Sequence, residues 1–458
     1  MDELLSTTSL DGRYKSRISE LSDYFSEYAL IKYRVIVEIK YLLELNKEKI
    51  FGVSQKDRDL LNSIIKNFSL KDAQRVKEIE KTTNHDVKAV EYFLRERLPK
   101  NIHQWIHFGL TSEDTNNLSY GLILRAAIKK AIYPALIDVE KALLDFSDKY
   151  SDTVMLARTH GQPAVPTTMG KEFSVYAYRL KEQLVELRNF TLVGKLNGAV
   201  GNYNSFVAAY PDKNWVSFSK NFVSRLELEP LLITTQIEPH DRMAKLCDIM
   251  SRINTILLDL SKDIWLYISF NYIIQGIAKD EVGSSTMPQK VNPIDFENCE
   301  GNLGMANSIF RHFSEKLPQS RLQRDLSDST VQRNFGTAFG YSLLAYKSLL
   351  KGLSKISANK GLMKNDLENH PEVISEGIQT ILRREGFSDA YETMKSMTRG
   401  KGINRKDIEN FVKNLSMKKD AKKELLKLTP LTYIGLSSKL AKMVVKECKA
   451  ELWMGDKK

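Results

Sequence analysis

The sequence has little cysteine and little proline, and it contains no long uninterrupted apolar run. Its three cysteines are far apart and lack metal-ligand spacing. They argue against a disulfide framework and favour reduced thiols in a cytoplasmic compartment. No stretch of about 18 apolar residues is present, so no membrane span is expected. The first residues have neither a basic segment nor an apolar core, so no secretory signal is expected.

Motifs for metals and common cofactors are missing as well. The chain has no His-Glu-x-x-His, no paired cysteine motif and no dinucleotide-type glycine pattern. The glycine-rich stretch 194–204 lacks phosphate-loop spacing and is interpreted as structural. We therefore expect a protein that works without a metal or a cofactor.

Negative charge is in deficit, and the net charge is +11. Residues 351–458 hold 23 Lys and Arg against 14 Asp and Glu, so most of the excess lies in the last quarter of the chain. These lysines alternate with acids at helical spacing, as in 418–424, which is typical of a solvated helix face and not of a nucleic-acid-binding stripe. A basic surface would still attract a polyanionic small substrate.

Apolar residues recur at helical spacing through most of the chain. From His240 to Gln275 there is neither Gly nor Pro, and apolar residues step by threes and fours, which predicts a helix of about 54 Å. Long helices are also expected at 18–48, 171–193 and 328–351, and shorter ones at 55–66, 71–81 and 85–98. The polar segment 82–86 offers Asn or Asp as the cap of the helix that follows it.

These patterns predict an all-α protein with a central bundle of long helices. A polar cluster at 111–117 marks one domain boundary, and shorter helical patterns begin near 365. We expect three domains: an N-terminal helical domain at 1–115, a central bundle domain at 116–364, and a small C-terminal helical domain at 365–458.

One long loop interrupts the helices, at 279–295. It holds Gly283, Pro288 and Pro293, which cannot continue a helix. Long loops in compact domains are usually functional or disordered, and this one carries adjacent hydroxyls, a lysine and an asparagine. Read by composition alone, a solvated Ser/Gly linker and a carboxylate-binding, proton-transferring loop are about equally supported.

The order of the residues in this loop favours the second interpretation. Residues 283–293 read Gly-Ser-Ser-Thr-Met-Pro-Gln-Lys-Val-Asn-Pro, which resembles the signature G-S-S-x-M-P-x-K-x-N-P of the aspartase/fumarase superfamily. Many relatives have histidine where this chain has Gln289, so a proton role for that position is in doubt. The resemblance implies an all-helical lyase that eliminates fumarate from a succinyl-bearing substrate.

A second segment narrows the resemblance to one branch. Residues 159–164 read Thr-His-Gly-Gln-Pro-Ala, similar to the adenylosuccinate lyases, whereas fumarases and argininosuccinate lyases typically show Thr-His-Leu-Gln. The segment follows a helical pattern and precedes Pro166, so we expect a turn at a helix end. By resemblance, His160 is the general acid, Ser284 is the general base, and Glu297 orients the imidazole of His160.

The resemblance also implies a set of substrate contacts that runs along the whole chain. His85 is a second candidate for proton transfer or phosphate binding, and the arginines suit a phosphate. The positions that match the family's substrate contacts are Arg13, Tyr14, Asn84, His85, Asp86, Thr111, Ser112, Gln236, Ser285, Lys290, Val291, Asn292, Asn298, Arg324, Ser329, Thr330, Val331, Gln332 and Arg333.

The implied reaction is β-elimination of fumarate from adenylosuccinate, giving AMP, and from the succinylated aminoimidazole carboxamide ribotide (SAICAR), giving its carboxamide (AICAR). The family's members are homotetramers whose sites draw on three subunits, so the resemblance implies a homotetramer. We expect this chain to be cytoplasmic, with no nucleic-acid or membrane partner. Three alternatives stay open: a sister enzyme such as argininosuccinate lyase, a catalytically silent helical bundle, and a basic nucleic-acid binder.

Overall fold

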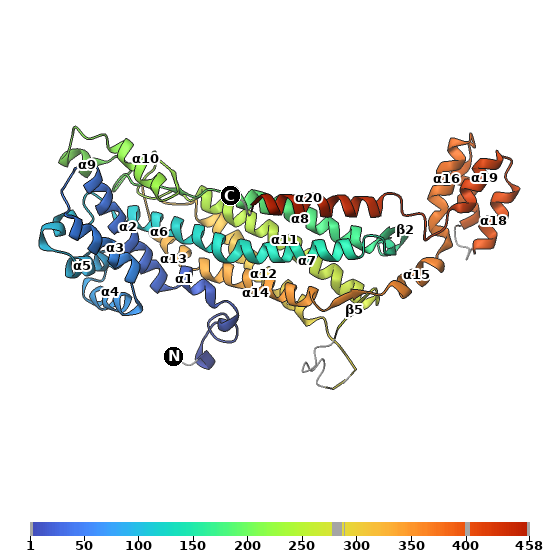
Figure 1. The fold of residues 1–458 in the computed structure, drawn as a ribbon, viewed down its shortest axis with the longest axis horizontal. Helices are drawn as coiled ribbons and strands as arrows, with labels where there is room; N and C mark the ends of the chain where they lie inside the picture. The colour runs from blue at the N-terminus through green and yellow to red at the C-terminus, as the bar shows by residue number, and fades with distance from the viewer. Residues whose placement is uncertain (1–2, 277–285, 288, 399–403, 456–458) are drawn as a thin grey trace. The chain divides into compact units, whose positions relative to one another are not determined.

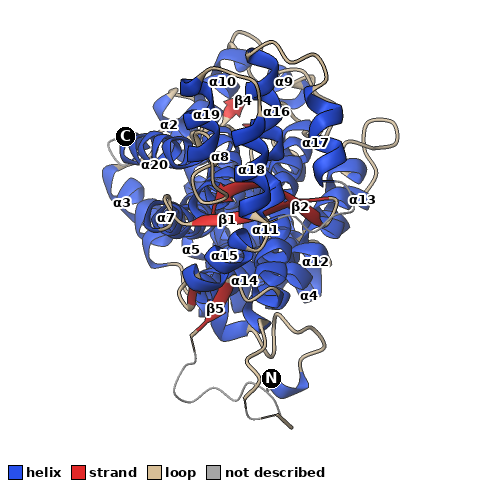
Figure 2. Cartoon of the chain, turned by 90° about the vertical axis from the view of Figure 1, so that its right-hand side faces the viewer, coloured by secondary structure: helices blue, strands red, loops and turns tan. Residues whose placement is uncertain are grey.

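The computed structural model describes residues 3–276, 286–287, 289–398 and 404–455, and these are mostly helical (Figures 1 and 2). The predicted helical class is confirmed. Contacts divide the chain into two compact units. Unit 1 holds the chain up to Leu136, Gln183–Thr255 and Gly301–Tyr346, and unit 2 holds Ile137–Glu182, Ile256–Glu300 and the chain from Lys347 onward. The predicted division into three domains at 115 and 364 stays a prediction.

Unit 1 contains most of the short N-terminal helices. Its helices are α1 Ser22–Phe25, α2 Glu27–Lys47, α3 Gln55–Asn67, α4 Leu70–Thr83, α5 Asp86–Arg97, α6 Ser112–Ala127, α9 Asn204–Ala209, α10 Trp215–Arg225 and α13 Ser327–Gln332. The short strands β3 Val193–Gly194 and β4 Glu229–Pro230 pair in parallel. Five longer helices contribute residues to both units: α7 Tyr133–Lys149, α8 Met169–Arg188, α11 Asp241–Ser269, α12 Ile294–Lys316 and α14 Phe335–Leu353.

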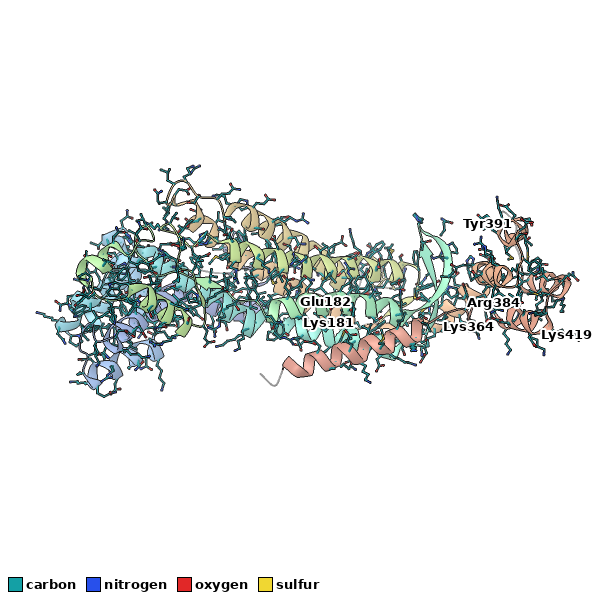
Figure 3. The ribbon with its side chains drawn as sticks, turned by 90° about the horizontal axis from the view of Figure 1, so that it is seen from above. Lys181, Glu182, Lys364, Arg384, Tyr391 and Lys419 are labelled. Atoms are coloured by element: carbon teal, nitrogen blue, oxygen red, sulfur yellow. The ribbon has the colours of Figure 1, made fainter. Side chains whose placement is uncertain are left out.

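Unit 2 adds two antiparallel strand pairs and the C-terminal helices. Strand β1 Val154–Thr159 pairs with β2 Gln162–Thr168, and β5 Ile273–Gln275 pairs with β6 Ile356–Ala358. The helices are α15 Lys360–Glu368, α16 Ser375–Arg384, α17 Ala390–Thr398, α18 Arg405–Asn414, α19 Lys419–Lys427 and α20 Ser437–Gly455. Helix α20 lies along α7 and α8, where Glu447 binds Lys181 (2.8 Å) and Lys449 binds Asp145 (3.2 Å; Figures 1 and 3).

The apolar stripe of α11 packs as its spacing predicts. Residues from Met243 to Ile264 at three- and four-residue steps are almost fully buried. The predicted helix is too long, however, because it ends at Ser269 and not at Gln275. Asn271 has a φ of 58°, which a helix cannot contain, and the chain then forms β5.

The short N-terminal helices form close to the predicted ranges, but the cap of α5 differs. Asn84 has a left-handed φ of 50° and ends α4. His85 caps α5, its Nδ1 accepting a hydrogen bond from the Lys88 N–H (3.2 Å). The Asn or Asp cap predicted from composition is therefore wrong. Among the helices of the described residues, none is both long enough and apolar enough to cross a membrane.

Candidate active site

His160 lies at the tip of a β-hairpin formed by β1 and β2. Thr159 pairs with Gln162, and His160 and Gly161 between them have φ values of 53° and 75°. Two left-handed residues joining two strands make a tight primed turn. The predicted turn at a helix end is therefore wrong, because α7 ends at Lys149 and a strand comes before the turn. The hairpin leaves His160 exposed to solvent.

Glu297 lies in the first turn of α12, where the helix dipole favours a carboxylate. Its Oε1 accepts a hydrogen bond from Trp265 Nε1 of α11 (3.2 Å). Among the described residues of one chain, no hydrogen bond or ion pair joins Glu297 to His160. The predicted pairing of the two therefore stays a prediction.

The segment before Glu297 is described only in part. Ser284 and Ser285 lie outside the described residues. Lys290 is exposed, and its N–H donates to the Met287 carbonyl (3.0 Å). Val291 and Asn292 are half-buried, Asn298 is exposed, and the Val291 carbonyl accepts from Gln275 Nε2 (3.1 Å). The segment that leaves the loop is thus attached to β5.

In unit 1, Asp86 forms ion pairs with two arginines. Its Oδ2 lies 2.7 Å from Arg34 Nη2 and 3.1 Å from Arg333 Nη2. Burial alone would raise the pKa of Asp86, but Arg34 and Arg333 lower it below its ordinary value. A cavity of about 180 Å³ lies beside Arg333 and is also lined by Glu27 and Tyr120. Asp86 therefore holds Arg333 at the edge of a hollow.

Arg324 is the centre of a second group in unit 1. Its guanidinium donates to Gln236 Oε1 (3.0 Å) and pairs with Glu113 Oε2 (3.1 Å). Glu113 is almost fully buried, and burial raises the pKa of its carboxyl to about 7, against the opposing charge of Arg324. Motif reasoning named Arg324 and Gln236 but missed Glu113, although it directly follows the singled-out Ser112.

The N-terminus of α6 carries Thr111 and Ser112. Thr111 and Asp114 form a capping box. Asp114 is also buried against Lys195 (2.9 Å) and accepts a hydrogen bond from the Asn197 N–H (3.1 Å). The glycine-rich stretch therefore fixes this helix end, in agreement with its structural interpretation.

His240 was not among the predicted site residues, although it contacts two of the segments that carry them. It is fully buried, with Nδ1 3.2 Å from Glu238 Oε2 and Nε2 3.4 Å from Asp328 Oδ2. The Gln332 amide nitrogen lies 3.2 Å from Nε2. These contacts join the segment that carries Gln236 to α13, whose residues Ser329–Gln332 were predicted to contact substrate. His240 lies four residues after Gln236, which was predicted to contact substrate, but its burial could not be read from the sequence.

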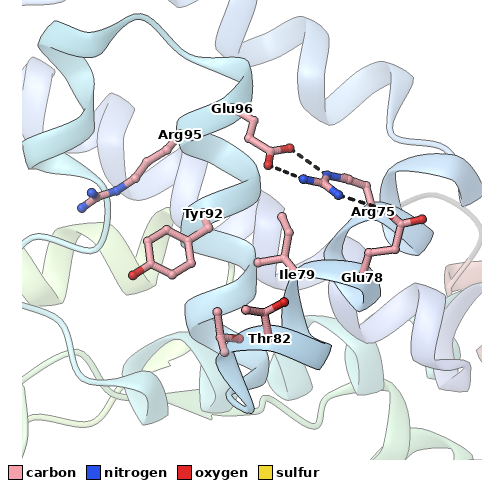
Figure 4. A pocket seen from close by; sticks show the side chains of 8 residues that line it. Arg75, Glu78, Ile79, Thr82, Tyr92, Arg95 and Glu96 are labelled. Atoms are coloured by element: carbon pink, nitrogen blue, oxygen red, sulfur yellow. Dashed lines mark hydrogen bonds and ion pairs between the residues drawn. The ribbon is translucent and has the colours of Figure 1, made fainter.

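The other predicted residues of unit 1 lie at its surface. The Arg13 guanidinium lies 5.8 Å from the centre of the Tyr14 ring, and His85 is exposed beside Asn84. A hollow of about 490 Å³ between α4 and α5 contains none of the predicted residues (Figure 4). Its Arg75 is paired with Glu96 (2.7 Å) and Glu78 (2.9 Å), so its charge is already neutralised. Within the described ranges, no three His, Cys, Asp or Glu are grouped as a metal site.

The family models that match this chain identify its class as a lyase. Residues 3–307 match the family model described as "Lyase", and residues 320–434 match the one described as "Adenylosuccinate lyase C-terminal". Solved structures of other enzymes share the fold. A fumarate lyase from Mesorhizobium sp. BNC1 has a TM-score of 0.75 at 15% identity, covering 93% of this chain and 97% of that one. The 3-carboxy-cis,cis-muconate lactonizing enzyme from Pseudomonas putida has a TM-score of 0.76 at 17% identity, covering 96% and 99%.

Relatives of much higher identity are named adenylosuccinate lyase. The one from Legionella pneumophila (strain Corby) is 49% identical over 442 residues, covering 94% of this chain and 97% of the relative. Those from Dictyostelium discoideum and Escherichia coli (strain K12) are 48% and 45% identical, each covering 95% of this chain and 97% of the relative. The chain belongs to the adenylosuccinate lyase family, which confirms the family predicted from the motifs.

Proposed function

We propose that this chain catalyses the β-elimination of fumarate from adenylosuccinate, leaving AMP, and from SAICAR, leaving AICAR. The observation that carries the proposal is the match to adenylosuccinate lyases at up to 49% identity over 94% of the chain. The intact signature at 283–293 supports it, because a silent bundle would not need those residues.

The chemistry is an acid–base elimination. Ser284 removes a proton from the carbon β to the departing nitrogen, and the resulting carbanion is delocalised into the neighbouring carboxylate. Lys290, Asn292 and Ser285 stabilise that negative charge. The C–N bond then breaks as His160 protonates the leaving nitrogen, and Glu297 orients the imidazole. No electrons or atoms are needed from a further reactant.

The unit 1 residues bind the nucleotide end. Arg324 and Arg333 are the phosphate- and ribose-side contacts, and each is held in place by a carboxylate, Glu113 or Asp86. A guanidinium that is already oriented loses less freedom when it binds a phosphate. The remaining members of this binding group are Arg13, Tyr14, Asn84, His85, Thr111, Ser112, Gln236 and residues 329–332.

The proposal includes a homotetramer in the cytoplasm whose sites combine residues of different subunits. Large apolar side chains left exposed on the long helices support an assembly. They include Val175 and Tyr178 on α8, Trp265 and Leu266 on α11, and Met305 on α12. The three cysteines are free and buried, as suits a reducing compartment.

The test is ultraviolet absorbance of the purified protein with adenylosuccinate, which follows the loss of substrate as AMP and fumarate form. We expect turnover by the parent, and a loss of about 10²–10⁴-fold in kcat for Ser284→Ala and for His160→Gln, the range of a positioned acid or base. Two matched variants of exposed residues, Ser354→Ala and His312→Gln, should keep the parent rate.

The outcomes separate the claims. Turnover that survives in Ser284→Ala would exclude Ser284 as the base but leave the lyase standing. If the parent does not turn over adenylosuccinate, three other substrates are tried in turn: argininosuccinate, malate and aspartate. Turnover of one of them would assign the chain to a sister activity.

A further inference from the structure

The carboxylate of Asp366, on α15, is bonded to two segments of unit 2. One is the hairpin that carries His160, and the other is the chain between α11 and β5. Its Oδ2 accepts hydrogen bonds from Arg158 Nη2 (3.1 Å) and from the Tyr272 hydroxyl. His370 Nε2 lies 3.5 Å from Oδ1. Arg158 comes two residues before His160 on the same hairpin. Asp366 is therefore bonded to the hairpin that carries the predicted general acid, two residues from it.

The hairpin reaches Asp366 because its base is fixed to the same helix. Leu156 of β1 is buried in one apolar core with Leu367, the neighbour of Asp366. The strand pairing is irregular between Leu156 and Arg158. Such an irregularity re-aims the side chains that follow it. The apolar contact thus holds the base of the hairpin, and the ion pair holds the arginine near its tip.

Helix α15 also contacts the segment between α11 and β5. The Tyr272 carbonyl accepts a hydrogen bond from the N–H of Asn359, the residue that caps α15 (2.8 Å). The Tyr272 hydroxyl reaches Asp366 from the same turn of chain. Tyr272 directly precedes β5, whose Gln275 is bonded to Val291. One helix therefore contacts both the hairpin and the strand to which the signature segment is attached.

Among the described residues, open space lies beside the tip of the hairpin. A hollow of about 420 Å³ is lined by Arg158, Gly161, Phe270 and Asp366. A Cβ added to Gly161 would meet no described atom within 4 Å. The Arg158 guanidinium lies over the Phe270 ring at 5.6 Å and against Asp366. With open space beside the turn, these polar contacts limit how far the tip can move.

We propose that Asp366 is a positioning residue for His160, which it holds in place through Arg158 and the β1–β2 hairpin. The inference rests on the proposed function, in which His160 protonates the leaving nitrogen. It gives α15, at the start of the C-terminal region, a part in catalysis. A proton donor displaced by about 1 Å can lose a hundredfold in rate, so the contact should act on kcat.

The experiment compares Asp366→Asn with Glu368→Gln, an exposed acid two residues away on the same helix. We expect Asp366→Asn to lower kcat for adenylosuccinate by about 10-fold or more, with KM within about 3-fold of the parent, because the nucleotide-binding residues of unit 1 are untouched. Glu368→Gln should match the parent. In a His160→Gln background, Asp366→Asn should change the residual turnover by less than about 2-fold, because the residue it acts through is gone.

A parent-like kcat for Asp366→Asn would overturn the inference and leave the proposed function intact. So would an equal loss in the presence and absence of His160, which indicates a general structural role. If Asp366→Asn shows no folded melting transition, Arg158→Gln decides, since it removes the same ion pair from the hairpin side. A kcat loss of about 10-fold at constant KM supports the proposal, and a parent-like kcat overturns it. A parent without turnover overturns both the inference and the function beneath it.

Discussion

At the scale of single residues, His240 is a buried histidine in a strained backbone conformation, beside the candidate nucleotide-binding residues. It has no exposed surface and a φ of 64°, a conformation that costs a residue with a Cβ about 1 kcal/mol or more. Glu238 compensates twice, accepting hydrogen bonds from the His240 backbone N–H (2.9 Å) and its ring. The imidazole therefore joins its own segment, at Glu238, to Asp328, which lies 88 residues after His240 in the chain.

This arrangement predicts a dependence of stability on pH. Burial lowers the pKa of His240, but the hydrogen bonds that its ring donates to Asp328 and Glu238 outweigh burial and raise the pKa from 6.5 to about 9. Below pH 6.5 both the folded and the unfolded states carry the proton, and the full stabilisation is present. As the pH rises through 9 the folded state loses it, so up to about 3 kcal/mol is lost across this window.

The measurement is the thermal unfolding midpoint of the parent and of His240→Gln between pH 6 and 9.5. We expect the parent's midpoint to fall more steeply, since the variant cannot bind the proton. The comparison separates the effect of His240 from that of Glu113 and Glu140. Burial raises the pKa values of these two carboxyls to about 7 and 8, so they also make the fold less stable as the pH rises, but at lower pH. Parallel pH profiles for parent and variant would show that His240 is neutral in the fold.

The sequence predicted part of this chemistry. The motif match named Arg324, Gln236 and Asp86, and the structure joins the first two and places the third against Arg333. It could not name Glu113 or His240, because their importance comes from burial beside charges distant in the chain. No periodic pattern records such pairs. The geometry around Ser284 lies outside the described residues, so its role stays a prediction.

At the scale of elements, the hairpin that carries His160 depends on how closely α7 and α8 meet. The Gly170 N–H donates to the Tyr150 carbonyl (2.9 Å), and the Ser147 hydroxyl donates to the Gly170 carbonyl (2.7 Å). A Cβ at Gly170 would lie 2.2 Å from the Ser147 carbonyl oxygen and 2.5 Å from the Ser151 backbone nitrogen. Only glycine fits, because the obstructing atoms are backbone.

Gly170→Ala should therefore destabilise the protein by about 3 kcal/mol, the upper part of the range for overpacked sites. Gly361→Ala in α15 is the control. Its added Cβ would meet only a side-chain atom at 3.9 Å, and alanine is a better helix former than glycine. Urea unfolding followed by far-ultraviolet circular dichroism measures both. A Gly170→Ala variant as stable as the control would mean that α7 and α8 separate at little cost.

Element boundaries show where sequence reasoning fails. The apolar stripe predicted the buried face of α11 but not its end at Ser269, because the residues up to Gln275 are mostly apolar and contain no Gly or Pro. The strand β1 begins Val-Met-Leu, a short apolar run that suits a helix or a strand equally. Only its pairing with β2 decides the matter, and pairing is a long-range property.

At the scale of the whole molecule, the single chain leaves large apolar side chains exposed on its long helices, among them Trp265 and Tyr178. Trp265 is the donor to Glu297, so a surface that is available for assembly lies directly beside a predicted catalytic residue. A chain that assembles through such surfaces can complete its sites with residues of its neighbours.

Mixing two inactive variants tests this assembly. His160→Gln lacks the proposed acid and Ser284→Ala the proposed base, so each alone should keep at most about 1% of the parent turnover. If the two residues of one site come from different subunits, hybrids formed by mixing the variants in equal amounts and allowing subunit exchange regain both groups in some sites. Random exchange in a symmetric tetramer should restore roughly a quarter of the parent turnover.

A mixture of His160→Gln with His160→Ala, which cannot complement, should stay inactive. If the first mixture also stays inactive while sedimentation shows a tetramer whose subunits have exchanged, both residues of each site come from one chain.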